Sequence, residues 1–229
     1  MRCDRCENND ARPYTITGLG TIYLCNSCGD KLNLKNKISK FVGISKVEQG
    51  AKLILEGLKD EFGLDITDPN FTDTPKRVAR AYYEICEGIN ASKEIGNILS
   101  TSFPSQYDGM IVAKDIVCWS LCPHHLLPVE YKVNFGYIPS EQVLGISKLS
   151  RLVELLAKQP KLQEDFTNDI VEILECNIHP KGIIVQVSGR HTCMVMRGAK
   201  QTNSWTLTSK ITGDFKNAET RNEFQMLIG

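Results

Sequence analysis

The chain has 229 residues, and its 27 Lys and Arg residues balance 27 Asp and Glu residues, so its formal net charge is zero. This length allows one large domain and a small module. The balanced charge excludes a broad basic field for nucleic acid, so nucleic acid is not an expected partner. The sequence contains no secretory hydrophobic region and no apolar run of about 18 to 20 residues, so we expect a cytoplasmic protein without a membrane partner.

Four cysteines near the N-terminus form two Cys-x-x-Cys pairs. Four thiolates complete a tetrahedron around zinc and leave no position for water, so this spacing is typical of a structural site. A redox dithiol is disfavoured, because there are two pairs and no βαβ pattern around them. Strand-like residues flank Gly18-Leu19-Gly20 between the pairs, which predicts a hairpin and a zinc-ribbon-like module over residues 1–34 with an unknown partner. The expected ligands of this structural zinc are Cys3, Cys6, Cys25 and Cys28.

Helical patterns follow the predicted module. After a polar connector at 33–43, the segment Ser45–Glu48 matches a capping box, and apolar residues then repeat at helical spacing until Gly63. Thr74-Pro75 places preferred residues at the start of a second helix, which Gly88 would end. We therefore expect a helical part at about 44–95.

Strand-like patterns dominate the C-terminal half. A β-rich run covers 110–121, and apolar and polar residues then alternate over 129–137, which predicts an antiparallel strand with one buried face. Antiparallel strands with helices between them predict an α+β fold. Further helices are expected at about 147–158, 160–176 and 219–227, and further strands at 182–196 and 204–212.

Three of the four histidines lie in two short strings, Cys122-Pro123-His124-His125 and His191-Thr192-Cys193. Thiolate and imidazole ligands suit Zn²⁺, and three protein ligands leave one tetrahedral position open for water, which is typical of a catalytic site. Cys122 and His125 could share an ion only across a turn, whereas His191 and Cys193 would lie on one face of a strand. For either string alone, buried thiols and core histidines are the better interpretation. Both strings together favour one shared metal site.

A second segment, Gly145–Arg151, has features of an anion site. Ser147 is a suitable N-cap residue, and Lys148 and Arg151 lie three apart on one helix face, where a phosphate would fit. Taken alone, these cations are better explained as solvated surface charges. Glu164 is by default a charge that complements a helix dipole, and its functional alternative is a carboxylate that binds guanine. Further candidate cations are Arg77, Arg80 and Arg197.

From about Val47 to its C-terminus, the chain resembles GTP cyclohydrolase I. The motifs of this resemblance are Thr74–Ala79, Cys122–His125, Gly145–Leu149, Gln163-Glu164, and His191–Cys193 followed by Met196–Gly198. The resemblance implies a tunnelling fold, in which an antiparallel sheet with helices packed on one side assembles into a ring-shaped barrel. It also implies a homo-oligomer, usually a decamer of two stacked rings, with active sites at subunit junctions. The implied domain spans 35–229, with its core at about 105–229.

The resemblance further implies zinc-dependent hydrolysis of GTP, with release of formate and formation of 7,8-dihydroneopterin 3′-triphosphate. This compound leads to folate, biopterin or deazaguanine products. The implied ligands of the catalytic zinc are Cys122, His125 and Cys193, and the implied proton-transfer residues are His124 and His191. Glu164, helped by Gln163, would bind guanine. The residues implied around the triphosphate are Ser147, Lys148, Arg151, Arg197, Arg77 and Arg80.

Two departures from the family pattern leave alternatives open. Pro123 stands where the family usually has Glu, so the chain lacks a carboxylate and a backbone N–H at that position. The N-terminal module lies outside the matched region. A silent cyclohydrolase-like domain that serves as an adaptor for nucleic acid or protein is therefore the second hypothesis. A nucleoside deaminase is disfavoured, because its His-x-Glu and Pro-Cys-x-x-Cys strings are absent from this sequence.

Overall fold

The computed structural model describes residues 12–16, 20–24 and 34–229, and the chain divides into two compact units, residues 1–84 and 85–229. The four N-terminal cysteines lie outside the described residues, so the structural zinc site and the module built on it stay predictions.

The first unit contains the predicted hairpin and two long helices. β1 (Arg12–Ile16) and β2 (Gly20–Leu24) pair antiparallel. α2 (Leu34–Phe62) begins well before the predicted cap at Ser45, so the polar connector and the capping box were wrong predictions. Polar residues without proline do not stop a helix, and an internal Gly such as Gly43 costs only about 1 kcal/mol.

After α2, the first unit continues through the short η1 (Pro69–Phe71) into α3 (Thr74–Ile85). α3 starts at Thr74-Pro75 as predicted. It ends before Gly88, which belongs to the separate 3-10 turn η2 (Glu87–Asn90) of the second unit.

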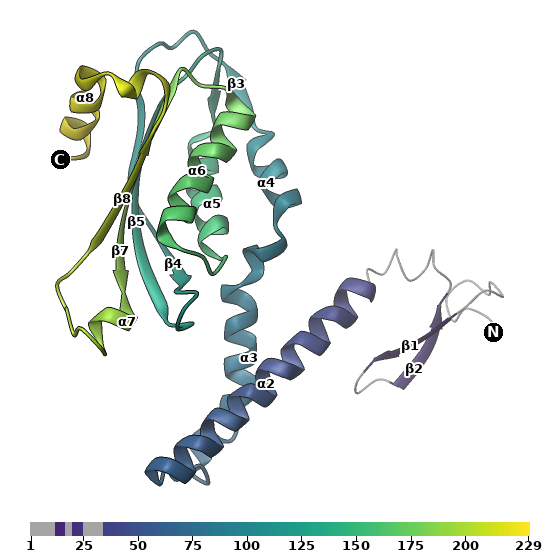
Figure 1. Cartoon of the computed structure of the whole chain (residues 1–229). Coiled ribbons are helices and arrows are strands. Elements are labelled where there is room, and N and C mark those ends of the chain that lie inside the picture. The colour runs from purple at the N-terminus through teal and green to yellow at the C-terminus, as the bar shows by residue number, and fades with distance from the viewer. Residues whose placement is uncertain (1–11, 17–19, 25–33) are drawn as a thin grey trace. The chain divides into compact units, whose positions relative to one another are not determined.

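The second unit is built on a four-stranded antiparallel sheet with the order β4-β5-β7-β8 (Figure 1). Its central strand β5 alternates as predicted, because every second residue from Val129 to Tyr137 is at most 1% exposed. The bounds of the strands are β4 (Ile111–Leu121), β5 (Pro128–Ile138), β7 (Gly182–His191) and β8 (Thr206–Ile211).

Helices α5 (Ile146–Ala157) and α6 (Gln163–Ile178) cover one face of the sheet, and their apolar sides form the main core with the inward residues of β5 and β7 (Figure 1). The other face is covered in part by η3 (Gly213–Lys216) and α8 (Ala218–Ile228). Gly136 makes this second packing possible, because a Cβ there would lie 2.9 Å from the Phe224 ring. The α+β prediction is thus confirmed, with an added helix on the second face.

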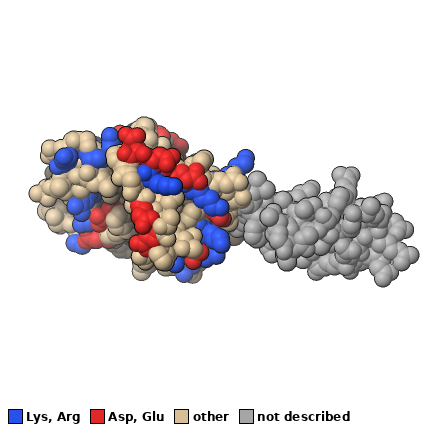
Figure 2. All heavy atoms as spheres, turned by 90° about the horizontal axis from the view of Figure 1, so that it is seen from below, with Lys and Arg blue, Asp and Glu red and all other residues tan. Residues whose placement is uncertain are grey.

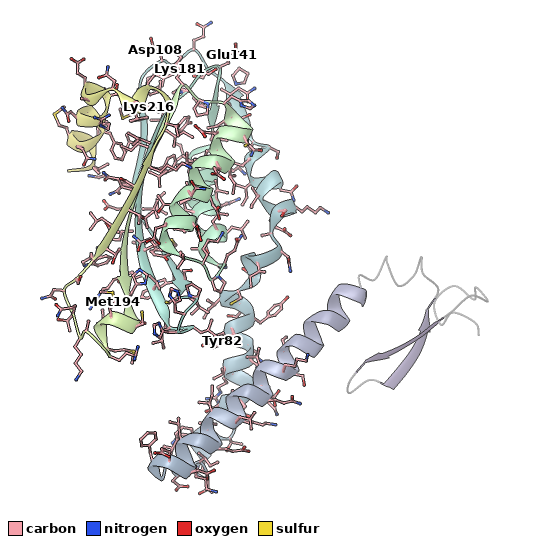
Figure 3. The ribbon with its side chains drawn as sticks, viewed as in Figure 1. Tyr82, Asp108, Glu141, Lys181, Met194 and Lys216 are labelled. Carbon is pink, nitrogen blue, oxygen red and sulfur yellow. The ribbon has the colours of Figure 1, made fainter. Side chains whose placement is uncertain are left out.

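Four elements were not anticipated from the pattern. α4 (Ser92–Leu99) follows η2, and β3 (Ser102–Pro104) pairs with β6 (Gln142–Leu144) in a small separate sheet. α7 (Thr192–Val195) follows directly after β7, where a continuous strand to Met196 was expected. Met194 of α7 marks one end of the sheet, and Lys181 and Lys216 mark the opposite end (Figure 3).

Charge is mixed over the described surface. Figure 2 shows acidic and basic side chains interspersed on the face that it presents. Within the described residues, no helix combines the length and the apolar character that a membrane span needs.

Candidate active site

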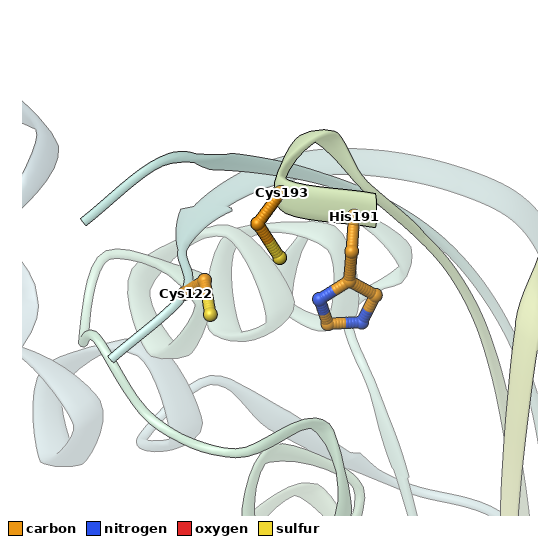
Figure 4. Close-up of side chains that lie close together, drawn as sticks. All are labelled: Cys122, His191 and Cys193. Carbon is orange, nitrogen blue, oxygen red and sulfur yellow. The ribbon is translucent and has the colours of Figure 1, made fainter. Parts of the chain in front are cut away.

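The two cysteine-containing strings meet at one end of the sheet. Leu121 at the end of β4 pairs with Pro128, and the next residue of β5, Val129, pairs with His191 at the end of β7. The pairing therefore brings the chain segments after β4 and β7 together. The ligand atoms of Cys122, His191 and Cys193 all lie within 4.8 Å of one another (Figure 4).

A tight turn after β4 gathers the first string. The N–H groups of His125 and Leu126 both donate to the Cys122 carbonyl oxygen, and Leu126 adopts a left-handed φ of 52°. The Nδ1 atoms of His124 and His125 lie 3.8 and 3.7 Å from Cys122 Sγ. The predicted break at Pro123 is thus present, and it places both imidazoles beside one thiol.

Cys193 lies on the helical turn α7, where a strand was predicted. The strand ends at His191, and a helical turn carries Cys193 back towards Cys122, so the prediction of a shared strand face was wrong. The Thr192 hydroxyl donates to the Pro128 carbonyl oxygen at 2.6 Å and fixes this turn to β5. Burial, followed by the neighbouring Cys122 thiol, raises the pKa of Cys193.

Two thiols and an imidazole within this distance fit a zinc ion by donor type and by proximity. The group differs in one member from the predicted ligands, since His191 stands where His125 was expected. His125 is nevertheless close. Bond lengths of about 2.3 and 2.0 Å place thiolate and imidazole ligands of one tetrahedral zinc roughly 3.5 Å apart, and His125 Nδ1 is 3.7 Å from Cys122 Sγ.

The buried side chain of Gln163, at the start of α6, holds His191 in place. Its Nε2 donates to the carbonyl oxygens of Val187 and Thr206 at 3.0 and 2.9 Å. This fixes the amide orientation, so Oε1 accepts from His191 Nε2–H at 2.9 Å. The Nδ1 atom of His191 is then the proton acceptor of the ring. Burial lowers the pKa of His191, and the smaller opposing influence is the charge of Glu164.

Glu164 follows Gln163 in the first turn of α6, as predicted, and its side chain is exposed. It lines a cavity of about 240 Å³ together with residues of α6 and β8. Its charge acts on both His191 and Tyr131, so it lies at the same end of the sheet as the two strings. The predicted guanine contacts of Glu164 and Gln163 stay predictions.

The predicted phosphate-binding residues are distributed over two helices, α3 and α5, and the segment after α7. α5 begins at Ile146 with Gly145 as its N-cap, so the prediction of Ser147 as the cap was wrong. Arg151 lines an open groove of about 350 Å³ whose other residues include Glu94, Glu154 and Lys158. The described positions of the remaining cations are Lys148 on α5, Arg77 and Arg80 on α3, and Arg197 after α7.

Two of these cations have contacts that bear on their role. Arg197 Nη1 lies 3.3 Å from His125 Nε2, which places this cation beside the first string. Arg77 Nη2 lies 3.8 Å from Asp73 Oδ2 in an exposed i, i+4 pair, which contributes little to stability. Triphosphate binding by all of these residues stays a prediction.

Tyr131 is a site residue that the sequence pattern had placed only in the core. Its hydroxyl is buried and has no hydrogen-bond partner within the part of the chain that the structure describes. Its ring meets the His191 ring edge-on at a centroid distance of 6.3 Å. A tyrosine at a fully buried position of an alternating strand is the one signal in the sequence that could have drawn attention to it.

Comparison with known proteins agrees with this geometry. The family model described as GTP cyclohydrolase I matches residues 47–229. The protein named GTP cyclohydrolase 1 of Carboxydothermus hydrogenoformans is 40% identical over 186 residues, which cover 80% of this chain and 94% of that relative. The proteins of the same name from Finegoldia magna and Enterococcus faecalis are 40% and 43% identical, each over 80% of this chain, with coverage of 97% and 96% of those relatives.

Proposed function

Because the chain belongs to the GTP cyclohydrolase I family, we propose that it hydrolyses GTP with release of formate and forms 7,8-dihydroneopterin 3′-triphosphate. This reaction is the first step of tetrahydrofolate, pterin or deazaguanine biosynthesis. The observation that carries the proposal is the meeting of Cys122, His191 and Cys193 at one end of the sheet, beside the Gln163-Glu164 pair.

Zinc is the cofactor that this donor set supports. When bound, it supplies Lewis-acid chemistry that makes water a nucleophile at neutral pH. We assign Cys122, His125 and Cys193 as its ligands, as the family resemblance implies. The 3.7 Å between His125 Nδ1 and Cys122 Sγ supports this assignment, although His124 Nδ1 lies at a similar 3.8 Å. A second, structural zinc at Cys3, Cys6, Cys25 and Cys28 is part of the same proposal.

His191 is then free to move a proton. Its Nε2–H is held by Gln163, its Nδ1 can accept, and its lowered pKa keeps the ring neutral and receptive near pH 7. His124, which is exposed beside Cys122, is the second proton carrier of the proposal. Glu164 and Gln163 would select guanine, and the cations around α5 and Arg197 would bind the triphosphate.

The assembly proposed for this chain is a homo-oligomeric ring, usually a decamer in the family. The strand order supports it, because the sheet is open and both β4 and β8 are edge strands. An open edge offers unpaired backbone groups to a further strand.

The deciding experiment measures formate and fluorescent pterin released from GTP by the full chain with its zinc. We expect both products from the parent and neither from Cys193→Ser, which should also lose one equivalent of zinc. Cys176→Ser is the matched control, since this thiol is exposed on α6. Formate without pterin would show that Pro123 marks a protein that opens the ring and does not complete the rearrangement. GTP binding without either product would favour the silent adaptor.

A further inference from the structure

The hydroxyl of Tyr131 is the one buried side-chain polar atom without a hydrogen-bond partner among the described residues. The side chain is 1% exposed, so water does not replace the missing partner at the surface. A buried hydroxyl without a partner destabilises a fold, and native chains rarely keep one without a functional reason. The position therefore indicates an acceptor that arises only when the site is complete.

The ring of Tyr131 is fixed on both sides. It stacks on Phe166 of α6 with centroids 4.8 Å apart and an interplanar angle of 12°. On β7 its register partner is Gly189, where a Cβ would lie 3.1 Å from Tyr131 Cε1. This glycine leaves room for the ring and for the Gln163 carboxamide, whose Oε1 would lie 2.1 Å from that Cβ. The ring also meets the His191 ring edge-on at the end of the sheet that carries the candidate metal site.

Three acidic groups lie near the hydroxyl. Burial raises the pKa of Tyr131 most, followed by the neighbouring Cys118 and Cys122 thiols and the Glu164 carboxylate. A tyrosine hydroxyl carries its proton at neutral pH, so this one can act as a donor. Cys118 is a poor acceptor, because burial raises the pKa of this thiol to about 12 and it stays protonated. Glu164 is exposed and can be satisfied by water.

Cys122 differs from the other two groups because it is a proposed zinc ligand. It is buried, with 5% of its surface exposed, and lies at the end of the strand that pairs with β5 through Cys118 and Tyr131. A cysteine that binds zinc does so as a thiolate, which carries charge and accepts hydrogen bonds. Zinc binding would thus create an acceptor beside an unpaired donor.

We propose that Tyr131 donates a hydrogen bond to the Cys122 thiolate when zinc is bound, and so acts as a positioning residue for this ligand. The inference rests on the zinc site of the proposed function. Hydrogen bonds to metal ligands orient them and tune the metal, and their removal typically weakens metal affinity about 10- to 100-fold.

The test compares Tyr131→Phe with Tyr137→Phe in the full chain. Tyr137 is a matched control, because it is buried on the same face of the same strand and its hydroxyl already accepts a hydrogen bond from Leu144 N–H at 3.1 Å. Zinc affinity is measured by competition with a chelator. The measurement concerns the proposed catalytic zinc, which is the equivalent that Cys193→Ser should lose. The thiolate-to-metal charge-transfer band of the cobalt-substituted protein gives a second readout.

We expect Tyr131→Phe to weaken zinc binding by about tenfold or more and to shift the cobalt band. The metal-free Tyr131→Phe variant should melt at the same temperature as the metal-free parent or higher, since the substitution removes no hydrogen bond. Tyr137→Phe should show the reverse, with parental zinc affinity and a lower melting temperature.

Parental zinc affinity and an unchanged cobalt band in Tyr131→Phe would overturn the inference. If GTP affinity alone fell, the hydroxyl would belong to the nucleotide site, and the assignment to Cys122 would be wrong. If Cys193→Ser loses no zinc relative to the parent, the zinc chemistry of the proposed function is overturned, together with this inference. The two failures are therefore distinguishable.

Discussion

At the end of the sheet near η3 and α8, the buried hydroxyl of Tyr137 has a partner within the chain, whereas at the end near α7 the buried hydroxyl of Tyr131 has none among the described residues. Tyr137 is bonded to Leu144, and the backbone of Lys181 is bonded to both Ile138 and Asp214. At the other end of β5, the Tyr131 hydroxyl has no hydrogen-bond partner among the described residues, and the Cys122 and Cys193 thiols lie close together beside His191. One end is complete as folded, and we propose that the other is completed by what it binds. The predictions below test this division.

The largest effect should come from the two histidines that compete for the metal. We expect His125→Ala to lose the zinc bound by Cys122 and Cys193 together with all turnover, because it removes a ligand. His191→Ala should retain that zinc and still lose turnover, because it removes a proton acceptor. Zinc content and formate release are measured for both variants. Loss of zinc in His191→Ala and its retention in His125→Ala would identify His191 as the ligand, in agreement with the group formed by Cys122, His191 and Cys193.

Guanine selection should give the next largest effect. We expect Glu164→Ala to reduce the preference for GTP over ATP by about two orders of magnitude or more, since a site built to hydrogen-bond one base leaves its groups unpaired with another. Asp165→Ala, in the same exposed turn of α6, is the control and should keep the preference. Competition binding measures both.

The triphosphate residues provide a contrast to Glu164. Lys148→Ala and Arg151→Ala should weaken GTP and ATP binding together, because a phosphate contact does not distinguish bases. An unchanged GTP preference in Glu164→Ala would show that this carboxylate only complements the helix dipole.

At the end of the sheet near η3 and α8, substitutions should change the free energy of unfolding and leave turnover unchanged. Gly213 has a φ of +51°, and a Cβ there would lie 1.9 Å from the Lys181 carbonyl oxygen. We expect Gly213→Ala to lower the free energy of unfolding by about 2 to 4 kcal/mol, with zinc content and turnover per folded molecule unchanged. Gly96→Ala, on an exposed and open position of α4, should stabilise the protein by about 0.5 to 1 kcal/mol. Denaturant titration measures both, and selective loss of turnover in Gly213→Ala would argue against the division.

Substitution of Gln163 should lower the free energy of unfolding by a smaller amount and should also reduce turnover. Gln163→Leu removes the partners of two backbone carbonyls and releases His191, so we expect a loss of about 2 to 3 kcal/mol and reduced turnover per folded molecule. Gln159→Leu is the control, because it removes a single bond to the Gly88 carbonyl oxygen and should leave turnover unchanged. Normal turnover in Gln163→Leu would show that His191 needs no orientation by this amide.

Much of the site followed from local patterns. The alternation of β5 identified its buried face, and the two cysteine-containing strings identified the residues of the candidate metal site before the structure showed that they meet. Both signals are short-range, because one depends on period-two burial and the other on ligand types within four residues.

The rest depends on long-range or weak signals. The β3–β6 pairing joins two three-residue strands about 40 positions apart, too short for a periodic pattern. The contact of Gln163 with Thr206 likewise joins residues 43 positions apart. The early start of α2 and the end of β7 at His191 reflect element boundaries, which capping and alternation specify only weakly.

The carboxamide of Gln163 also makes the edge strand β8 part of the proposed catalytic geometry. A single side chain bonds to Val187 in β7, to Thr206 in β8 and to the imidazole of His191. Edge strands open locally at a lower free energy than the centre of a sheet. On heating, once the proposed ring no longer covers the edge of β8, the fraying of this strand should therefore release His191 and abolish turnover while the helices and the inner strands still give a native circular dichroism signal.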